Sequence, residues 1–152
     1  MNAAAPGHIP WARVNVRLQA TRSIWLSTTR PDGRPHCVPV WFVWQDNKAW
    51  FITDRQLQKA RNLAGAGWVV LCAGDGDDVI IIEGPASVVT DETEKDAVDR
   101  LYSAKYVDPA TGQTDTVHHE RADLYRVTAR HVMTWEYGSV AGRTDWRFDA
   151  LD

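Results

Sequence analysis

Three basic side chains follow one another at short spacing and have the chemistry to bind an anion. They are Arg55, Lys59 and Arg61, and the pattern around them predicts a helix over residues 55–64 with Asp54 as its N-cap. The first turn of a helix leaves backbone amides free, so these amides and the basic side chains together favour a bound phosphate. The alternative is an ordinary solvated helix face, because Lys59 and Arg61 point in nearly opposite directions, although Arg55 shares a face with Lys59.

The stretch that precedes this helix is apolar on both faces. Residues 36–44 read HCVPVWFVW, and alternate residues of a strand point to opposite sides of the sheet. A small barrel has only one interior, so its other face must be covered by a partner subunit, a ligand or both. We therefore expect a homodimer. An apolar sheet surface beside an anion-binding helix end also suits a flat, phosphorylated cofactor.

No side chain must act as a general acid, and the catalytic residues are left unassigned. The candidates are His36, Tyr102, His131 and Tyr137, and we expect each of them to be structural. His131 is expected to be a partly buried histidine with satisfied hydrogen bonds, on one strand face with Tyr125, Val127, Met133 and Trp135. Cys37 and His36 are strand neighbours and face opposite sides, which excludes a thiol–base pair.

The run His118-His119-Glu120 invites a metal interpretation, which its spacing does not favour. Adjacent histidines on a loop point in different directions, and no third ligand stands at a suitable distance along the chain. We expect a solvated loop and no metal site.

The elements that must position these residues are mostly strands joined by short turns. Strands are predicted at 23–29, 36–44, 49–53, 68–72, 79–89 and 124–137, and helices at 55–64 and 92–106. Residues 12–22 fit either a short helix or a lead-in strand. Gly84-Pro85 predicts a bulge or an edge, since proline cannot donate to a ladder. This pattern predicts a mainly β protein with short helices, in which six antiparallel strands form a closed barrel.

Composition bounds the remaining possibilities. At 152 residues we expect a flexible leader over residues 1–10 and a single domain over residues 11–152. The net charge of -3 gives no reason to expect nucleic-acid binding, and no segment is long and apolar enough to span a bilayer. The N-terminus lacks the pattern of a signal peptide, and the two cysteines lie far apart. A cytoplasmic protein with reduced thiols is the expectation.

Several of these segments together resemble a known family. They are TTRPDGRPHCVPVWFVW, WFIT and KARNL, followed by IEGPASVVTDE, LYRVTARHVMTWE and RTDWRF. Their order and spacing resemble the split β-barrel flavin and deazaflavin oxidoreductases of the pyridoxamine 5′-phosphate oxidase-like superfamily. The PVWFVW and KARNL forms look closest to the branch that depends on coenzyme F-420. The substrate-binding set of a true pyridoxamine phosphate oxidase is not recognisable, so that activity is not expected.

The resemblance implies a six-stranded FMN-binding split barrel that dimerises, with two cofactor sites at the interface. The implied cofactor is coenzyme F-420, with FMN as the alternative. The implied activity is transfer of hydride from reduced coenzyme F-420 to a small organic acceptor; the alternatives are an FMN-dependent oxidoreductase or a non-catalytic flavin, deazaflavin or tetrapyrrole-binding protein.

The resemblance also assigns residues to the cofactor. Residues along the ring would be Val38, Pro39, Val40, Trp41 and Phe42. Those that hold the phosphate would be Thr53, Lys59, Arg61 and Asn62, and those that approach from the partner chain would be Trp146 and Arg147.

Overall fold

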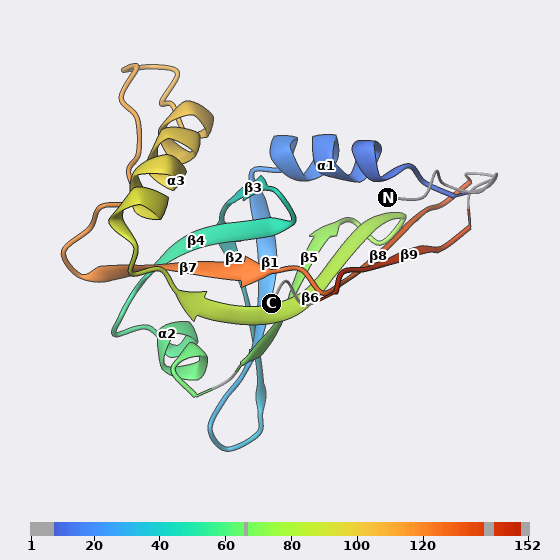
Figure 1. Cartoon of the computed structure of the whole chain (residues 1–152), viewed down its shortest axis with the longest axis horizontal. Coiled ribbons are helices and arrows are strands. Elements are labelled where there is room, and N and C mark those ends of the chain that lie inside the picture. The colour runs from blue at the N-terminus through green and yellow to red at the C-terminus, as the bar shows by residue number, and fades with distance from the viewer. Residues whose placement is uncertain (1–7, 66, 139–141, 150–152) are drawn as a thin grey trace.

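The computed structural model describes residues 8–65, 67–138 and 142–149, and within them the chain forms three helices and nine strands (Figure 1). The helices are α1 (Trp11–Ala20), α2 (Gln58–Leu63) and α3 (Glu92–Lys105). The strands are β1 (Ser23–Thr29), β2 (Pro35–Trp41), β3 (Val43–Gln45), β4 (Lys48–Asp54), β5 (Trp68–Gly74), β6 (Asp78–Val88), β7 (Ala122–Thr128), β8 (His131–Glu136) and β9 (Thr144–Arg147). The predicted class, mainly β with short helices, is confirmed; the predicted count of six strands is not.

One antiparallel sheet runs through all the described strands. Its order is β2-β1-β5-β6-β7-β4-β3, while β8 pairs with β6 and β9 pairs with β8. The strands at the two ends of this order, β2 and β3, are consecutive in the chain and only Phe42 separates them. The sheet therefore curls until its two edge strands are joined covalently, which is the arrangement of a split barrel.

The break at Phe42 overturns the prediction of one strand over residues 36–44. Here the backbone leaves the ladder because the end of α3 takes over its polar groups. The Phe42 N–H donates to the Tyr106 hydroxyl at 2.8 Å, and the Phe42 carbonyl accepts from Lys105 Nζ at 2.9 Å and from the Tyr106 hydroxyl at 2.7 Å. A buried backbone group that loses its sheet partner needs another one. We call this set of hydrogen bonds the Phe42 clamp.

A second break separates β7 from β8, where the sequence predicts one strand over residues 124–137. Ala129 N–H donates to the Asn47 carbonyl and Arg130 N–H to the Glu83 carbonyl, so the chain bends out of one pairing and into another. β6 changes neighbour at the same place, from β8 to β7. A side chain at Gly84 would collide with the Thr128 carbonyl oxygen, so this crossing requires glycine. The predicted bulge or edge at Gly84-Pro85 is thus a switch of partner strand.

The helices also differ in part from their predicted bounds. Residues 12–22 resolve in favour of a helix, α1. The helix predicted over residues 55–64 begins only at Gln58, because the Asp54 carboxylate accepts from the Gln56 N–H and closes a turn ahead of it. Asp54 is therefore not the N-cap of α2. Residues 1–7 of the expected leader lie outside the described residues, whereas Ile9 is buried and its N–H donates to the Thr144 hydroxyl.

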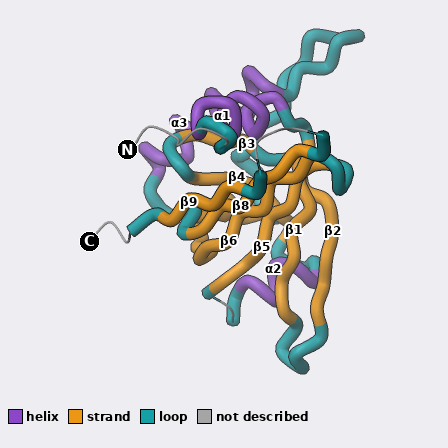
Figure 2. The backbone as a smooth tube through the Cα atoms, turned by 90° about the vertical axis from the view of Figure 1, so that its right-hand side faces the viewer, coloured by secondary structure: helices purple, strands orange, loops and turns teal. Residues whose placement is uncertain are grey.

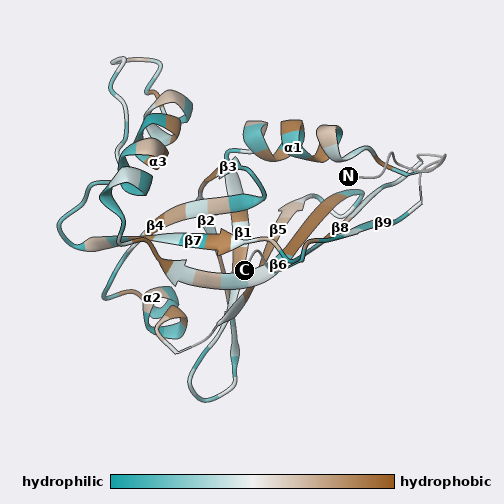
Figure 3. Cartoon of the chain, in the orientation of Figure 1, coloured by the Kyte–Doolittle hydropathy of each residue, from teal (hydrophilic) through white to brown (hydrophobic). Residues whose placement is uncertain are grey.

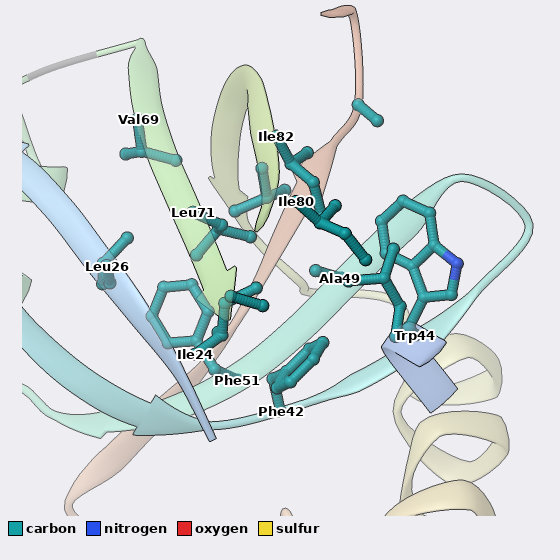
Figure 4. Packing of buried hydrophobic residues seen from close by; sticks show 14 of the residues in the cluster. Ile24, Leu26, Phe42, Trp44, Ala49, Phe51, Val69, Leu71, Ile80 and Ile82 are labelled. Carbon is teal, nitrogen blue, oxygen red and sulfur yellow. The ribbon is translucent and has the colours of Figure 1, made fainter. Parts of the chain in front are cut away.

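The core fills the curled sheet and extends under α3. Figure 4 shows side chains from β1, β4, β5 and β6 that point toward one another, including Ile24, Phe51, Leu71 and Ile80. Hydrophobic residues gather on the strands, most plainly on β6, while the tip of the β1–β2 hairpin is hydrophilic (Figure 3). In the turned view of Figure 2, α1 and α3 lie at one end of the sheet and α2 lies at the other, beside β1 and β5. None of the described helices has the length and apolarity needed to cross a membrane.

We expect the Phe42 clamp to make stability depend on pH. Burial and, secondarily, the charge of Arg22 lower the pKa of Lys105 from its usual 10.5 to about 8. Between these values the unfolded chain binds more protons than the folded one, so the free energy of unfolding rises with pH. This rise in stability can be read up to about pH 10, the usual pKa of tyrosine. Burial raises the pKa of Tyr106 to about 12, so above pH 10 the titration of Tyr106 lowers the free energy of unfolding.

The test compares urea unfolding of the wild type and Lys105→Met from pH 8 to pH 10. The stability of the wild type should rise relative to that of the variant across this window, because methionine has no proton to lose. Lys48→Met, at the start of β4, serves as a control and should follow the wild type. Parallel pH profiles for the wild type and Lys105→Met would contradict the assignment.

Candidate functional site

An open pocket of about 660 Å³ lies where β4 ends, beside α2 and the loop that leads to β7. Its lining residues are Ile52, Thr53, Asp54, Leu57, Lys59, His118, His119, Glu120, Arg121 and Ala122. The pocket brings together two of the side chains that the resemblance assigns to a phosphate, Thr53 and Lys59. We call it the β4 pocket.

Thr53 and Lys59 are both without a partner in the described part of the chain. The Thr53 side chain is only 4% exposed, and its hydroxyl makes no hydrogen bond to any described residue. No ion pair or hydrogen bond of Lys59 occurs there either; burial lowers its pKa, and the charge of Asp54 opposes this shift. A buried polar group that lacks a partner is costly, so an unpaired hydroxyl and an unpaired ammonium suit an anionic ligand.

Of the three basic side chains that the sequence groups together, Arg55 and Arg61 are already occupied. Arg55 precedes α2, forms an ion pair with Asp123 at 2.8 Å and donates to two backbone carbonyls, so the expectation that it shares a helix face with Lys59 is wrong. Arg61 donates to the Gln56 carbonyl and to the side chain of Gln58. The β4 pocket therefore presents Lys59, with Arg121 also in its lining, and not the predicted cluster of Arg55, Lys59 and Arg61.

Asn62 is buried and ties α2 to the sheet. Its side-chain amide donates to the Thr28 hydroxyl at 2.8 Å and accepts from Gln58 at 2.8 Å. Because Thr28 lies on the inner face of β1, this bond fixes the end of the sheet against which α2 packs. Asn62 thus positions the helix that carries Lys59, and it does not line the β4 pocket.

The ring residues expected from the resemblance divide between the two faces of β2. Val40 and Phe42 are buried inside the barrel, and Val38 is on the same side but only half-buried, nearer the hairpin tip. Pro39 and Trp41 point outward, and Trp41 is 44% exposed. None of the five lines the β4 pocket, so a ligand that used both regions would have to reach from the pocket along β2.

A group of side chains that the sequence did not single out surrounds Trp41. The Tyr106 ring stacks on it at 4.8 Å between ring centres, and the Arg22 guanidinium lies 4.7 Å from the Trp41 ring centre. Lys105 Nζ lies 4.3 Å from the ring centre of Phe42, the next residue. Nothing in local spacing connects Tyr106 with a strand 64 residues earlier, so this group could be found only from the tertiary structure.

Trp146 and Arg147 lie on β9, in a different part of the same chain from the β4 pocket. The Trp146 ring packs against Trp11 of α1 at 5.2 Å, on the inner side of the sheet. Arg147 is exposed and stands opposite His131 on the outer side. Only Arg147 is therefore placed to reach outward, and the role of both residues toward a partner chain stays a prediction.

His131 is partly buried and satisfied, as predicted, with Nδ1 3.3 Å from Glu83 and Nε2 2.8 Å from Asp145. It does not share a face with Tyr125 and Val127, because the break after β7 changes the alternation. His118 and His119 lie near Asp96 and Asp115, at 3.5 and 3.8 Å. No group of three metal-binding side chains occurs in the residues described.

Comparisons with known proteins place the fold. Three similar solved structures are the conserved hypothetical protein Rv2991 from Mycobacterium tuberculosis, General Stress Protein 26 from Bacillus anthracis, and PhzG from Burkholderia lata in complex with tetrahydrophenazine-1-carboxylic acid. Their identities are 23%, 21% and 20%, and their TM-scores are 0.68, 0.66 and 0.65. The matches cover 90%, 90% and 93% of this chain and 90%, 97% and 85% of theirs. At these identities the likeness shows a shared fold.

A search of curated proteins finds no match. The sequence itself, however, matches the family model described as Pyridoxamine 5′-phosphate oxidase over residues 11–136. This match takes in all the described elements except β9. The chain therefore belongs to the pyridoxamine 5′-phosphate oxidase family.

Proposed function

We propose that the protein is a cytoplasmic oxidoreductase that uses coenzyme F-420 to reduce a small organic acceptor. The observation that carries this proposal is the pair of unpartnered donors, the Thr53 hydroxyl and Lys59 Nζ, in the β4 pocket. These donors are what the phosphate of a flavin or deazaflavin would require. The PVWFVW and KARNL forms support F-420 over FMN, which is the alternative cofactor that members of the family commonly bind.

The residues of the chain divide the work of holding such a cofactor. Lys59 and the Thr53 hydroxyl would bind the phosphate, while Asn62 holds α2 in place. The half-buried Val38 and the backbone of β2 would supply an apolar surface along which a planar ring can lie. The bound cofactor would supply the hydride chemistry, so the protein has to orient the ring and exclude water rather than provide a strong acid or base.

We also propose that two copies pair through the outer face of the sheet. Trp25 is 51% exposed, and the strand register places it beside Pro39 on β2 and Cys72 on β5. The apolar row continues through Ile81 on β6 to Met133 on β8. We call this row the outer face. A contiguous apolar row of exposed and half-buried side chains of this kind is typical of an interface, and a self-complementary pairing would cover it in both copies.

Arg147 supports a cofactor site that involves both copies. β9 extends the sheet beyond β8, and Arg147 stands at the margin of the outer face beside His131. A second copy on this face would therefore receive Arg147 rather than Trp146, whose side chain packs against α1.

One prediction concerns the binding of the cofactor phosphate by Lys59. Coenzyme F-420 and FMN are titrated separately into the wild type and Lys59→Ala, and affinity is read from absorbance and fluorescence. Lys59→Ala should weaken binding of the preferred cofactor by about 1–3 kcal/mol, the scale of a charged hydrogen bond. Lys48→Ala, which removes a lysine outside the β4 pocket, should bind as the wild type does.

The outcomes of this titration separate the alternatives. Failure of the wild type to bind either cofactor would refute the proposal, and unchanged affinity in Lys59→Ala would place the phosphate elsewhere. Haemin is titrated in parallel to test the tetrapyrrole alternative. If a cofactor binds but its reduced form is not oxidised by acceptors such as quinones or biliverdin, the protein is a carrier rather than an enzyme.

Another prediction concerns the dimer. Trp25→Glu should shift the wild-type mass in sedimentation equilibrium from dimer to monomer, because pairing would bury an uncompensated carboxylate. Val16→Glu changes a residue of α1 that is 64% exposed and should leave the mass unchanged. A monomeric wild type, or a Trp25→Glu variant that remains dimeric, would rule out pairing through the outer face.

A further inference from the structure

A second pocket, of about 460 Å³, lies between α3 and the hairpin that joins β3 to β4. The hairpin contributes Lys48 to its lining, the helix contributes Ala97, Arg100 and Leu101, and β7 contributes Arg126. It shares no lining residue with the β4 pocket. Sites for small molecules typically measure roughly 300–1,000 Å³, so this pocket can hold a ligand of its own. We call it the α3 pocket.

The floor of the α3 pocket is apolar. Val98 and Trp50 are buried, and the half-buried Leu101 packs against the same cluster. The one polar atom of Trp50 is already bonded, because its indole N–H donates to the Glu94 carboxylate at 2.8 Å. The floor therefore offers hydrocarbon surface to a ligand and no free hydrogen-bonding group.

Two of the charged side chains of the pocket neutralise each other. Both carboxylate oxygens of Glu94 accept from one terminal nitrogen of Arg126, at 3.0 and 2.8 Å. Glu94 also takes the Trp50 N–H, so its acceptors are engaged on the protein side. This pair forms a wall of the pocket and leaves no net charge there.

Lys48 and Arg100 are the basic side chains that remain. Neither forms an ion pair or a hydrogen bond with any residue that the structure describes. Asp99, beside Arg100 in the chain, already accepts from the loop that follows α3. The other carboxylate of the lining, Asp46, makes no ion pair with a described residue either. The lining thus has two unpaired cations against one carboxylate, which favours an anion.

The hairpin that carries Lys48 is held in place. Its turn residues Asp46 and Asn47 have φ values of 49° and 60°, as a two-residue hairpin turn requires, and the Asn47 carbonyl accepts from the Ala129 N–H. The register of β4 and β7 places Lys48 diagonally across from Arg126, on the face that α3 covers. A ligand would therefore meet a preformed pocket, which lowers the entropic cost of binding.

We infer that the α3 pocket binds a small organic anion with an aliphatic body, such as a medium-chain carboxylate. The chain of such a ligand covers Val98 and Leu101, and its carboxylate accepts hydrogen bonds from Lys48 and Arg100. The inference goes beyond the proposed function, because this pocket is separate from the β4 pocket and needs neither cofactor nor turnover.

The experiment measures binding of octanoate to the purified full-length protein by isothermal titration calorimetry. 1-Octanol keeps the chain without the charge, and acetate keeps the charge without the chain. The wild type should bind octanoate more tightly than either comparator, and equal affinity for octanoate and 1-octanol would overturn the inference. Lys48→Met and Arg100→Met should each weaken octanoate about tenfold and leave 1-octanol unchanged, because each removes one cation.

Filling the pocket tests its place in the fold without changing any charge. Ala97→Leu adds a side chain to the helix wall and should weaken both octanoate and 1-octanol at least tenfold. Leucine is a good helix former, so α3 should persist. Ala104→Leu is the matched control, because Ala104 is also exposed on α3 but lies outside the pocket. Unchanged octanoate affinity in Ala97→Leu, or an equal loss in Ala104→Leu, would overturn the inference.

Two further titrations distinguish this site from the proposed cofactor site. Lys59→Ala should bind octanoate as the wild type does, and a loss there would assign octanoate to the β4 pocket and overturn the inference. Octanoate should also bind with unchanged affinity in the presence of whichever cofactor the protein takes, whereas competition would give the α3 pocket to the cofactor. If no cofactor binds, the titrations of the free protein still decide the inference.

Discussion

The architecture depends on how the backbone at Phe42 is satisfied. A strand apolar on both faces would continue from β2 into β3, but the ladder breaks at Phe42, where the chain passes from one edge of the sheet to the other. The Tyr106 hydroxyl and Lys105 Nζ take the N–H and carbonyl that the ladder gives up. Because these groups come from the end of α3, the helix, the barrel and the position of Trp41 are set by one group of hydrogen bonds. The loss of the Tyr106 hydroxyl would leave the buried Phe42 N–H unpaired.

The β4 pocket contains fewer of the predicted cations than the sequence suggests, because two of them form ion pairs or hydrogen bonds within the chain. Arg55 is drawn to Asp123, and Arg61 folds back on the turn before its own helix. Both are satisfied within the chain. Lys59 and Thr53 are not, and an unpaired donor in a partly desolvated position is the usual mark of a ligand site rather than of packing. The candidate site is therefore defined by polar side chains that the folded chain leaves without a hydrogen-bond or ion-pair partner.

Much of the fold could be predicted from the sequence, because strand periodicity and turn chemistry are local. The turn at Pro31-Asp32-Gly33, the β1–β2 hairpin that it closes and the extent of α3 follow from residues close to one another. The breaks at Phe42 and after β7 could not be predicted, since their cause is a hydroxyl or a carbonyl from a distant segment. The late start of α2 has a local cause, the turn closed by Asp54, yet the same aspartate is equally suited to cap a helix.

The same division applies to function. The sequence alone was enough to show that the chain belongs to the family and has an apolar strand followed by a basic helix. These features depend on the types and spacing of residues that lie near one another in the chain. Tertiary structure decided which of the basic residues are free, on which side of β2 each apolar residue lies, and that Arg22, Trp41 and Tyr106 meet. The physical reason is that a side chain is free to bind a ligand only if no other residue of the fold has already paired with it. Whether an arginine or an indole can bind a ligand depends on which carboxylates and rings the fold has already placed against it, and these come from anywhere in the chain.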